Sequence, residues 1–185
     1  MGVKGMKKIK EVIEKSLQEL HYRDKILLEI KANERSITHK LACYIDKYIN
    51  EIGHWDVDAE YNRSIDIRKS LNCPELDFEQ EFNYPDIIIH KRGKSNYNLE
   101  VDNHNLLIIE LKVNENNKIN KKDFKKIQCF IKSFPYYYNY GLFINLNTRN
   151  KDNFSYWLTY FKKIVTNREV ECEEIETYNF SLPTN

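Results

Sequence analysis

Two stretches decide the fold of this chain: YPDIIIH at residues 84–90 and NLLIIELKV at residues 105–113. Each contains an unbroken apolar run, which predicts a strand that is covered on both faces. A polar stretch around Gly93 separates them and predicts a turn. If the two strands pair as an antiparallel hairpin, the start of the first lies beside the end of the second.

Three charged residues lie at the facing ends of these two strands. Asp86 follows Pro85 at the start of the first strand, and Glu110 and Lys112 lie at the end of the second. Because side chains alternate along a strand, Glu110 and Lys112 project from one face while Leu111 points to the other. The antiparallel pairing would bring Asp86 close to Glu110. Charged groups inside apolar strands are costly, which indicates that these three have a joint use.

Two carboxylates and a lysine suit the metal-assisted hydrolysis of a phosphodiester. Mg²⁺ and Mn²⁺ prefer hard oxygen ligands, and such a cation would offset the repulsion between Asp86 and Glu110. It would also acidify a bound water and neutralise a scissile phosphate. Lys112 would orient or deprotonate that water, or stabilise the transition state. The alternative is structural: Asp86 caps a turn, and Glu110 and Lys112 form an exposed ion pair.

Helices are predicted before these strands. Apolar residues at helical spacing predict an amphipathic helix over residues 6–20, and residues 24–31 predict a second, short one. Asn33 is a suitable N-cap for a helix over residues 34–51. Glu34 falls on the inward stripe of that helix, where a carboxylate needs a partner or a metal.

The remaining elements follow from the same patterns, namely a strand at 55–61, a helix at 121–134, a strand at 141–147 and a helix at 153–165. The apolar face of the last helix would consist of Phe154, Trp157, Leu158 and Phe161. Residues 64–80 and the C-terminal tail show no clear pattern. Strands covered by helices on both sides predict an α/β fold with a central mixed sheet flanked by helices.

The chain resembles the PD-(D/E)xK, restriction-endonuclease-like nuclease superfamily. The segments NERSITHKLACYI, DVDAEYNR, YPDIIIHKRG and NLLIIELKVN are similar to a group of small bacterial and archaeal members, and the resemblance covers residues 33–146. It implies an αβββαβ core. We expect a single domain over residues 1–185, with a helical extension at 1–32, a catalytic core at 33–147, and a C-terminal helix and tail at 148–185.

The resemblance also implies an activity and the roles of individual residues. The protein would be a Mg²⁺- or Mn²⁺-dependent endo- or exodeoxyribonuclease, a hydrolase of ester bonds. Asp86 and Glu110 would ligate the cation together with the backbone carbonyl of Leu111. Lys112 would be catalytic, and Glu34 would assist the metal or its water.

One motif of the superfamily is incomplete in this chain. RecB-like members have a QxxxY motif on the helix after the catalytic lysine. Gln128 is present here, but Lys132 stands where the tyrosine would be. Gln128 either reaches the catalytic residues or makes hydrogen bonds at the edge of the core.

Nucleic acid is the expected partner, with DNA favoured over RNA. Candidate phosphate contacts are the helical lysines Lys121, Lys125 and Lys132, with Arg35 and Arg92 elsewhere. The alternative for the lysines is a solvated helix face. His90 shares the face of Asp86, and it either supports the site or is a strand-end histidine satisfied by its neighbours.

The composition limits these expectations. A net charge of +1 gives no global support for nucleic-acid binding, although a local basic face would suffice. Four cysteines without CxxC spacing predict free, buried thiols in a reducing cytoplasm. No apolar signal core or membrane span is apparent, so a cytoplasmic protein is expected.

A domain this small favours low specificity, a homodimer, or a protein partner that supplies recognition. Two other function classes stay open. The chain could be a catalytically silent nucleic-acid-binding or regulatory module on the same fold, or a subunit of a defence complex.

Overall fold

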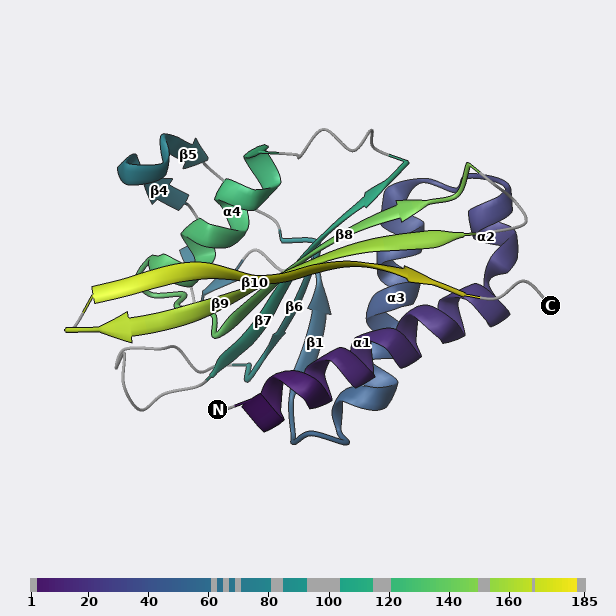
Figure 1. Cartoon of the computed structure of the whole chain (residues 1–185), viewed down its shortest axis with the longest axis horizontal. Coiled ribbons are helices and arrows are strands. Elements are labelled where there is room, and N and C mark those ends of the chain that lie inside the picture. The colour runs from purple at the N-terminus through teal and green to yellow at the C-terminus, as the bar shows by residue number, and fades with distance from the viewer. Residues whose placement is uncertain are drawn as a thin grey trace.

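A computed structural model describes residues 3–60, 63–64, 67–68, 71–80, 85–92, 104–114, 121–149, 154–167 and 169–182 of the chain. The fold is mixed α/β: one six-stranded, mostly antiparallel sheet has helices against its faces (Figure 1). The helices are α1 (Val3–Arg23), α2 (Lys25–Glu29), α3 (Glu34–Ile49) and α4 (Lys121–Lys132), with a 3-10 turn, η1 (Pro74–Leu76).

The strands of the large sheet lie in the order β1 (Asp56–Ala59), β6 (Ile87–His90), β7 (Asn105–Val113), β8 (Tyr140–Asn147), β9 (Ser155–Thr166) and β10 (Glu169–Ser181). Two small hairpins accompany it. They pair β2 (Arg63–Ser64) with β3 (Ile67–Arg68), and β4 (Leu71–Cys73) with β5 (Phe78–Gln80). These hairpins occupy the stretch for which the sequence predicted no pattern.

The central strands β6 and β7 form the expected antiparallel hairpin, with Ile87 opposite Ile109 and Ile88 opposite Ile108. β7 and β8 are parallel. Parallel neighbours need a crossover connection, and α4 provides it. The start of β6 therefore lies beside the end of β7, where the charged residues were predicted to meet.

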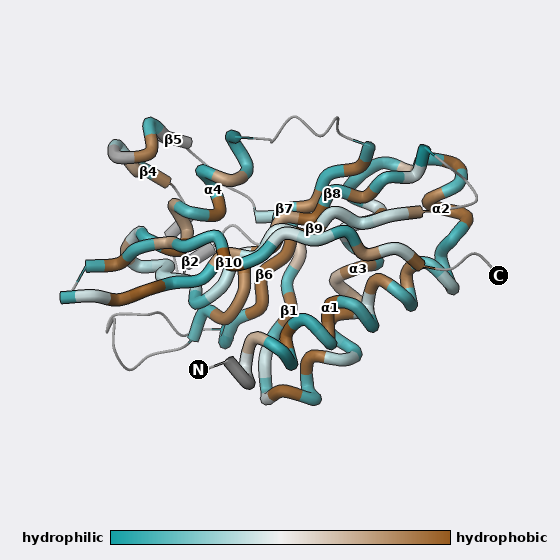
Figure 2. The backbone as a smooth tube through the Cα atoms, in the orientation of Figure 1, coloured by the Kyte–Doolittle hydropathy of each residue, from teal (hydrophilic) through white to brown (hydrophobic). Residues whose placement is uncertain are grey.

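Successive residues of β7 pack into two different cores, one on each face of the sheet. Leu107, Ile109 and Leu111 belong to the core beneath α1 and α3, whereas Ile108 belongs to the core beneath α4. Figure 2 shows hydrophobic residues concentrated in β6 and in alternating bands along α1 and α3. Because both faces are covered, the central stretches of β6 and β7 are apolar without interruption, as the sequence predicted.

Two local features fix the helices next to the sheet. The side chain of Asn33 accepts a hydrogen bond from the backbone N–H of Ser36 at 2.8 Å, which confirms the predicted N-cap of α3. α4 lies very close to β8, because a Cβ atom on Gly141 would overlap Cγ2 of Ile127. Only a glycine at this position allows so close an approach of helix and sheet.

The C-terminal region differs from the prediction. Residues 153–165 were expected to form a helix, but β9 covers most of this range, and the tail adds β10. The four residues assigned to one helical face do not share a face: Phe154 and Leu158 belong to the core beneath α1, and Phe161 to the core beneath α4. Apolar residues on both sides of the strand hide its period of two.

The prediction of four free, buried thiols is wrong, because two of the cysteines are bonded to each other and the free ones are exposed (Cys43) or half-buried (Cys172). Cys73 on β4 and Cys129 on α4 form a disulfide, whereas Cys43 and Cys172 are free. The two bonded cysteines are 56 positions apart and are adjacent only because β4 packs on α4. No helix in the described part of the chain is long and apolar enough to cross a membrane.

Candidate functional site

Asp86 lies directly beside the end of β7. Its Oδ2 accepts a hydrogen bond from the backbone N–H of Leu111 at 2.7 Å. This bond holds the carboxylate next to the two residues that flank Leu111. Burial raises the pKa of Asp86, and this effect outweighs the opposing influence of the Leu111 N–H and of the Lys112 and Lys126 ammonium groups.

Glu110 is the most deeply buried charge of the site, with 1% of its surface exposed. The Nζ of Lys126, on α4, lies 2.8 Å from its Oε1 and 2.9 Å from its Oε2. Burial raises the pKa of Glu110 to about 8 even though Lys126 lowers it, and the carboxylates of Asp86 and Asp123 raise it further. A second cation near Glu110 would therefore be electrostatically favourable.

Lys112 is held from two sides. Its Nζ donates to Oε1 of Glu34 at 2.8 Å and to the backbone carbonyl of Leu111 at 3.2 Å. Burial lowers the pKa of Lys112, but the ion pair with Glu34 and the nearby carboxylates of Asp86 and Asp123 more than offset it, so the pKa is raised. The side chain is therefore an ammonium at neutral pH.

Glu34 meets Lys112, but not from the inward position that the helical wheel predicted. It is the first residue of α3, and 38% of its side chain is exposed. The position of Glu34 at the N-terminus of α3, rather than on the buried face of the helix, brings this carboxylate to β7. An acidic group in the first turn also suits the helix dipole.

Two residues of α4 that the sequence did not single out complete the cluster. Asp123 and Lys126 are both 8% exposed, and both interact electrostatically with Glu110. A signal for them exists in the sequence, because Asp123 is spaced i, i+4 and i+7 with Ile127 and Phe130, on the buried face of the helix. Lys126 was not among the helical lysines that were predicted to contact nucleic acid.

The donor set can be compared with what a divalent cation needs. Asp86, Glu110 and the carbonyl of Leu111 offer hard oxygens, which fit Mg²⁺ or Mn²⁺. Among the described residues no group of three or more His, Cys, Asp and Glu side chains is arranged to hold a metal. The two carboxylates and the carbonyl thus have the donor chemistry that a divalent cation requires. The ammonium of Lys126 already lies beside one of these carboxylates, that of Glu110.

Gln128 is half-buried on α4. In the described part of the chain no hydrogen bond joins its side chain to Asp86, Glu110, Lys112 or Glu34. The structure therefore groups four of the five predicted catalytic residues by direct contact or by electrostatic interaction and leaves Gln128 apart from them.

The predicted nucleic-acid contacts lie in several places. Lys121 is exposed at the start of α4 and Lys132 is half-buried at its end. Lys125 lies 3.9 Å from a carboxylate oxygen of Asp77. Arg35 is largely exposed and pairs with Glu60, its Nε lying 2.6 Å from Oε1.

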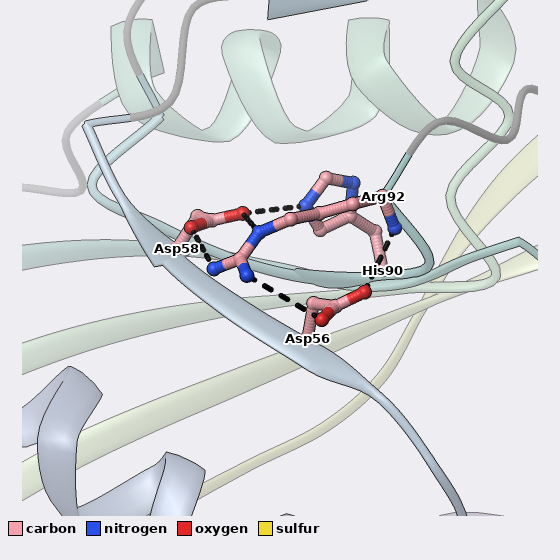
Figure 3. A network of polar contacts seen from close by, with 4 residues as sticks. All are labelled: Asp56, Asp58, His90 and Arg92. Carbon is pink, nitrogen blue, oxygen red and sulfur yellow. Dashed lines mark hydrogen bonds and ion pairs between the residues drawn. The ribbon is translucent and has the colours of Figure 1, made fainter.

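Arg92 takes part in a separate polar network at the edge of the sheet (Figure 3). Its guanidinium donates to both carboxylate oxygens of Asp58, at 2.6 and 2.9 Å, and its backbone N–H donates to Asp56. Nε2 of His90 lies 2.8 Å from Oδ2 of Asp58. His90 is buried and satisfied by this neighbour, and it stands at the end of β6 opposite to Asp86.

The charges of this network support one another. Burial raises the pKa of Asp58, but the hydrogen bonds from Arg92 and His90 outweigh it and leave the pKa below its ordinary value. The guanidinium of Arg92 is thus held at the edge of the sheet by two carboxylates. Its contact with nucleic acid stays a prediction.

Comparisons with models of protein families, with curated proteins and with solved structures found no match to this chain.

Proposed function

We propose that the protein is a metal-dependent nuclease of the PD-(D/E)xK superfamily that hydrolyses phosphodiester bonds in DNA. One observation carries this proposal: the backbone N–H of Leu111 binds the Asp86 carboxylate at 2.7 Å, between Glu110 and Lys112. An acid just before β6 thus lies beside the end of β7, which carries the second acid and the lysine. Their burial is costly for stability and is explained by a use in chemistry.

The order of elements supports the same assignment. From residue 34 the chain runs through α3, β1, β6, β7, α4 and β8, apart from the small hairpins between β1 and β6. This order agrees with the αβββαβ core that the resemblance implies. The charged residues lie on α3, before β6 and on β7, which are the places that the resemblance assigns to them.

Each residue of the site has a chemical part in the proposed reaction. Asp86, Glu110 and the carbonyl of Leu111 would hold Mg²⁺ or Mn²⁺. When bound, the cation would activate water and neutralise charge on the scissile phosphate. The raised pKa of Lys112 favours an ammonium that orients water or stabilises the charged transition state over a role as a base. Glu34 holds this ammonium in place.

A second candidate function is supported by one observation. Lys126 contacts both oxygens of Glu110, so a cationic group already neutralises the carboxylate. A protein in which this ion pair were permanent would keep the fold without binding metal. It would then be a nucleic-acid-binding or regulatory module rather than an enzyme.

The decisive experiment is a cleavage assay on plasmid, linear and single-stranded DNA and on RNA, with Mg²⁺ or Mn²⁺. We expect wild type to cleave DNA and Lys112→Ala to lose activity at least a hundredfold, the order expected for one transition-state contact. Lys122→Ala, an exposed lysine of α4, is the matched control and should keep full activity.

Metal binding is checked separately by thermal denaturation. Mn²⁺ should stabilise wild type and fail to stabilise Asp86→Asn, because a ligand that binds only the folded state raises its stability. Absence of both cleavage and metal stabilisation in wild type would favour the binding module.

A further inference from the structure

A row of four side chains crosses the sheet in line with Lys112. Cross-strand pairing places Lys112 opposite Asn145 on β8, Asn145 opposite Trp157 on β9, and Trp157 opposite Asn179 on β10. Side chains of directly opposed residues project from the same face of a sheet. All four therefore lie on the same face of the sheet as α4, which covers other residues of these strands.

α4 covers the adjacent rows of this face and not this one. Phe124, in the first turn of α4, packs on Phe143 and Phe161, and Lys126 reaches Glu110. Glu110 and Phe143 pair with each other two residues before Lys112 and Asn145. In Figure 1, β8 and β9 continue to the right beyond the helix. Within the described part of the chain, no ring contact joins Trp157 to α4.

Trp157 is unusual on this face because it is a large aromatic residue that is 45% exposed. Thr159 and Phe161, which follow it on the same side of β9, are almost fully buried. The next row towards the strand ends, Asn147, Ser155 and Ser181, is polar and contains no carboxylate. The glutamates of β10 lie in the other half of that strand, from Glu169 to Glu176.

We propose that Trp157 stacks on a base of a single-stranded nucleic acid whose backbone lies at Lys112. This inference rests on the proposed function, which identifies the ligand as nucleic acid, and adds that this nucleic acid is single-stranded. Two inter-strand steps separate Lys112 from Trp157, about 10 Å. An indole ring offers a flat surface that binds any base, and base–aromatic stacking is the main feature of single-strand binding. The Asn179 amide beside it can bond the edge of that base.

A duplex would not fit this arrangement. In a duplex each base is stacked between its neighbours, so its face is covered, whereas a single strand presents unstacked bases to aromatic side chains. The spacing of Lys112 and Trp157 on one flat row suits a backbone and a base of the same extended strand. The substrate class is therefore single-stranded DNA, or a single-stranded end or flap of a duplex.

Binding is the first test. A labelled single-stranded oligonucleotide is titrated with protein in Ca²⁺, without Mg²⁺ or Mn²⁺, and the dissociation constant is read from fluorescence anisotropy. We expect Trp157→Ala to weaken binding by roughly ten- to a hundredfold. Trp157→Phe, which keeps an aromatic ring, should weaken it less. Val165→Ala, an exposed apolar residue of the same strand, is the control and should bind as wild type does.

Two results of this titration would overturn the inference. One is unchanged single-strand affinity in Trp157→Ala, and the other is a wild type that binds duplex as tightly as single strands or binds neither. Thermal denaturation shows whether each variant is folded. If Trp157→Ala does not fold, Trp157→Phe and the fluorescence measurement below decide.

The second test observes the ring itself. The chain has two tryptophans, so Trp55→Phe leaves Trp157 as the only one. Single-stranded DNA should quench its fluorescence, and a strand of abasic sites should not. Unchanged fluorescence at saturating DNA would refute stacking. Quenching without any cleavage in Mg²⁺ or Mn²⁺ would refute the proposed nuclease activity and support the stacking site. Cleavage without quenching would support the nuclease activity and refute the stacking site.

Discussion

Lys126 of α4 and Glu110 of β7 form an ion pair at the interface of helix and sheet, with Nζ 2.8 and 2.9 Å from the two carboxylate oxygens. Both side chains are buried. The pair joins α4 to the strand that also holds Lys112. It thereby couples the position of the helix to the charge of the site.

Removing the ammonium should destabilise the metal-free protein. Lys126→Met leaves the buried Glu110 side chain without its hydrogen-bond partner. We expect a loss of about 1–3 kcal/mol in the free energy of unfolding, measured with urea, as for other buried groups that lose a partner. Lys125→Met, at the next position but paired only loosely with Asp77, should have little effect. Equal effects of the two substitutions would show that the buried ion pair contributes nothing specific.

Stability should also depend on pH through Glu110. Its pKa is about 8 in the folded protein against 4.5 ordinarily. Between these pH values the folded state holds a proton that the unfolded state has released, so this group's contribution to stability decreases as pH rises from about 4.5 to about 8. In urea unfolding across this range, Glu110→Gln should show a flatter decline than wild type. Parallel curves for the two proteins would contradict the raised pKa.

Gly141 should not tolerate a side chain. The Cβ of Gly141→Ala would overlap Cγ2 of Ile127 and force α4 away from β8. We expect a loss of about 1–3 kcal/mol from overpacking, measured by chemical denaturation. Displacement of the helix should also lower the proposed cleavage of DNA, because Lys126 and Asp123 move with it. Asn147→Ala, at the exposed end of β8, provides the comparison and should change neither the stability nor the cleavage of DNA.

The network at the edge of the sheet should affect stability alone. Asp58→Asn removes the carboxylate that holds Arg92 and His90. Because Arg92 is 56% exposed, solvent screening limits the expected loss to about 1 kcal/mol. Cleavage of DNA should be unchanged, since Asp58 makes none of the contacts of the candidate site. A drop in activity with unchanged stability would instead assign the network to the reaction.

The sequence predicted the centre of the molecule well, because there local pattern and tertiary structure agree. The apolar runs before Glu110 and after Asp86 become paired strands, and Asn33 caps its helix as expected. The prediction of a helix over residues 153–165 failed for a physical reason. β9 is inside the sheet, so both of its faces are apolar, and the spacing of its apolar residues fits a helix equally well. Its many aromatic and β-branched residues favoured a strand.

The residues of the site show the same limit. The proximity of Asp86 and Glu110 could be predicted from the sequence because a hairpin fixes their register. Lys126 could not, since its contact with Glu110 depends on how α4 lies on the sheet. Cys73 and Cys129 were missed likewise, because no local spacing announces a bridge over 56 positions.

That bridge has a topological consequence. The main chain from Cys73 to Cys129, closed by its disulfide, is a covalent ring. Asp86, Glu110, Lys112 and Lys126 all belong to this ring, whereas Glu34 lies outside it. A protease that cuts once between β6 and β7 would therefore open the ring without releasing a fragment, and the cut halves would migrate together until a reductant separates them.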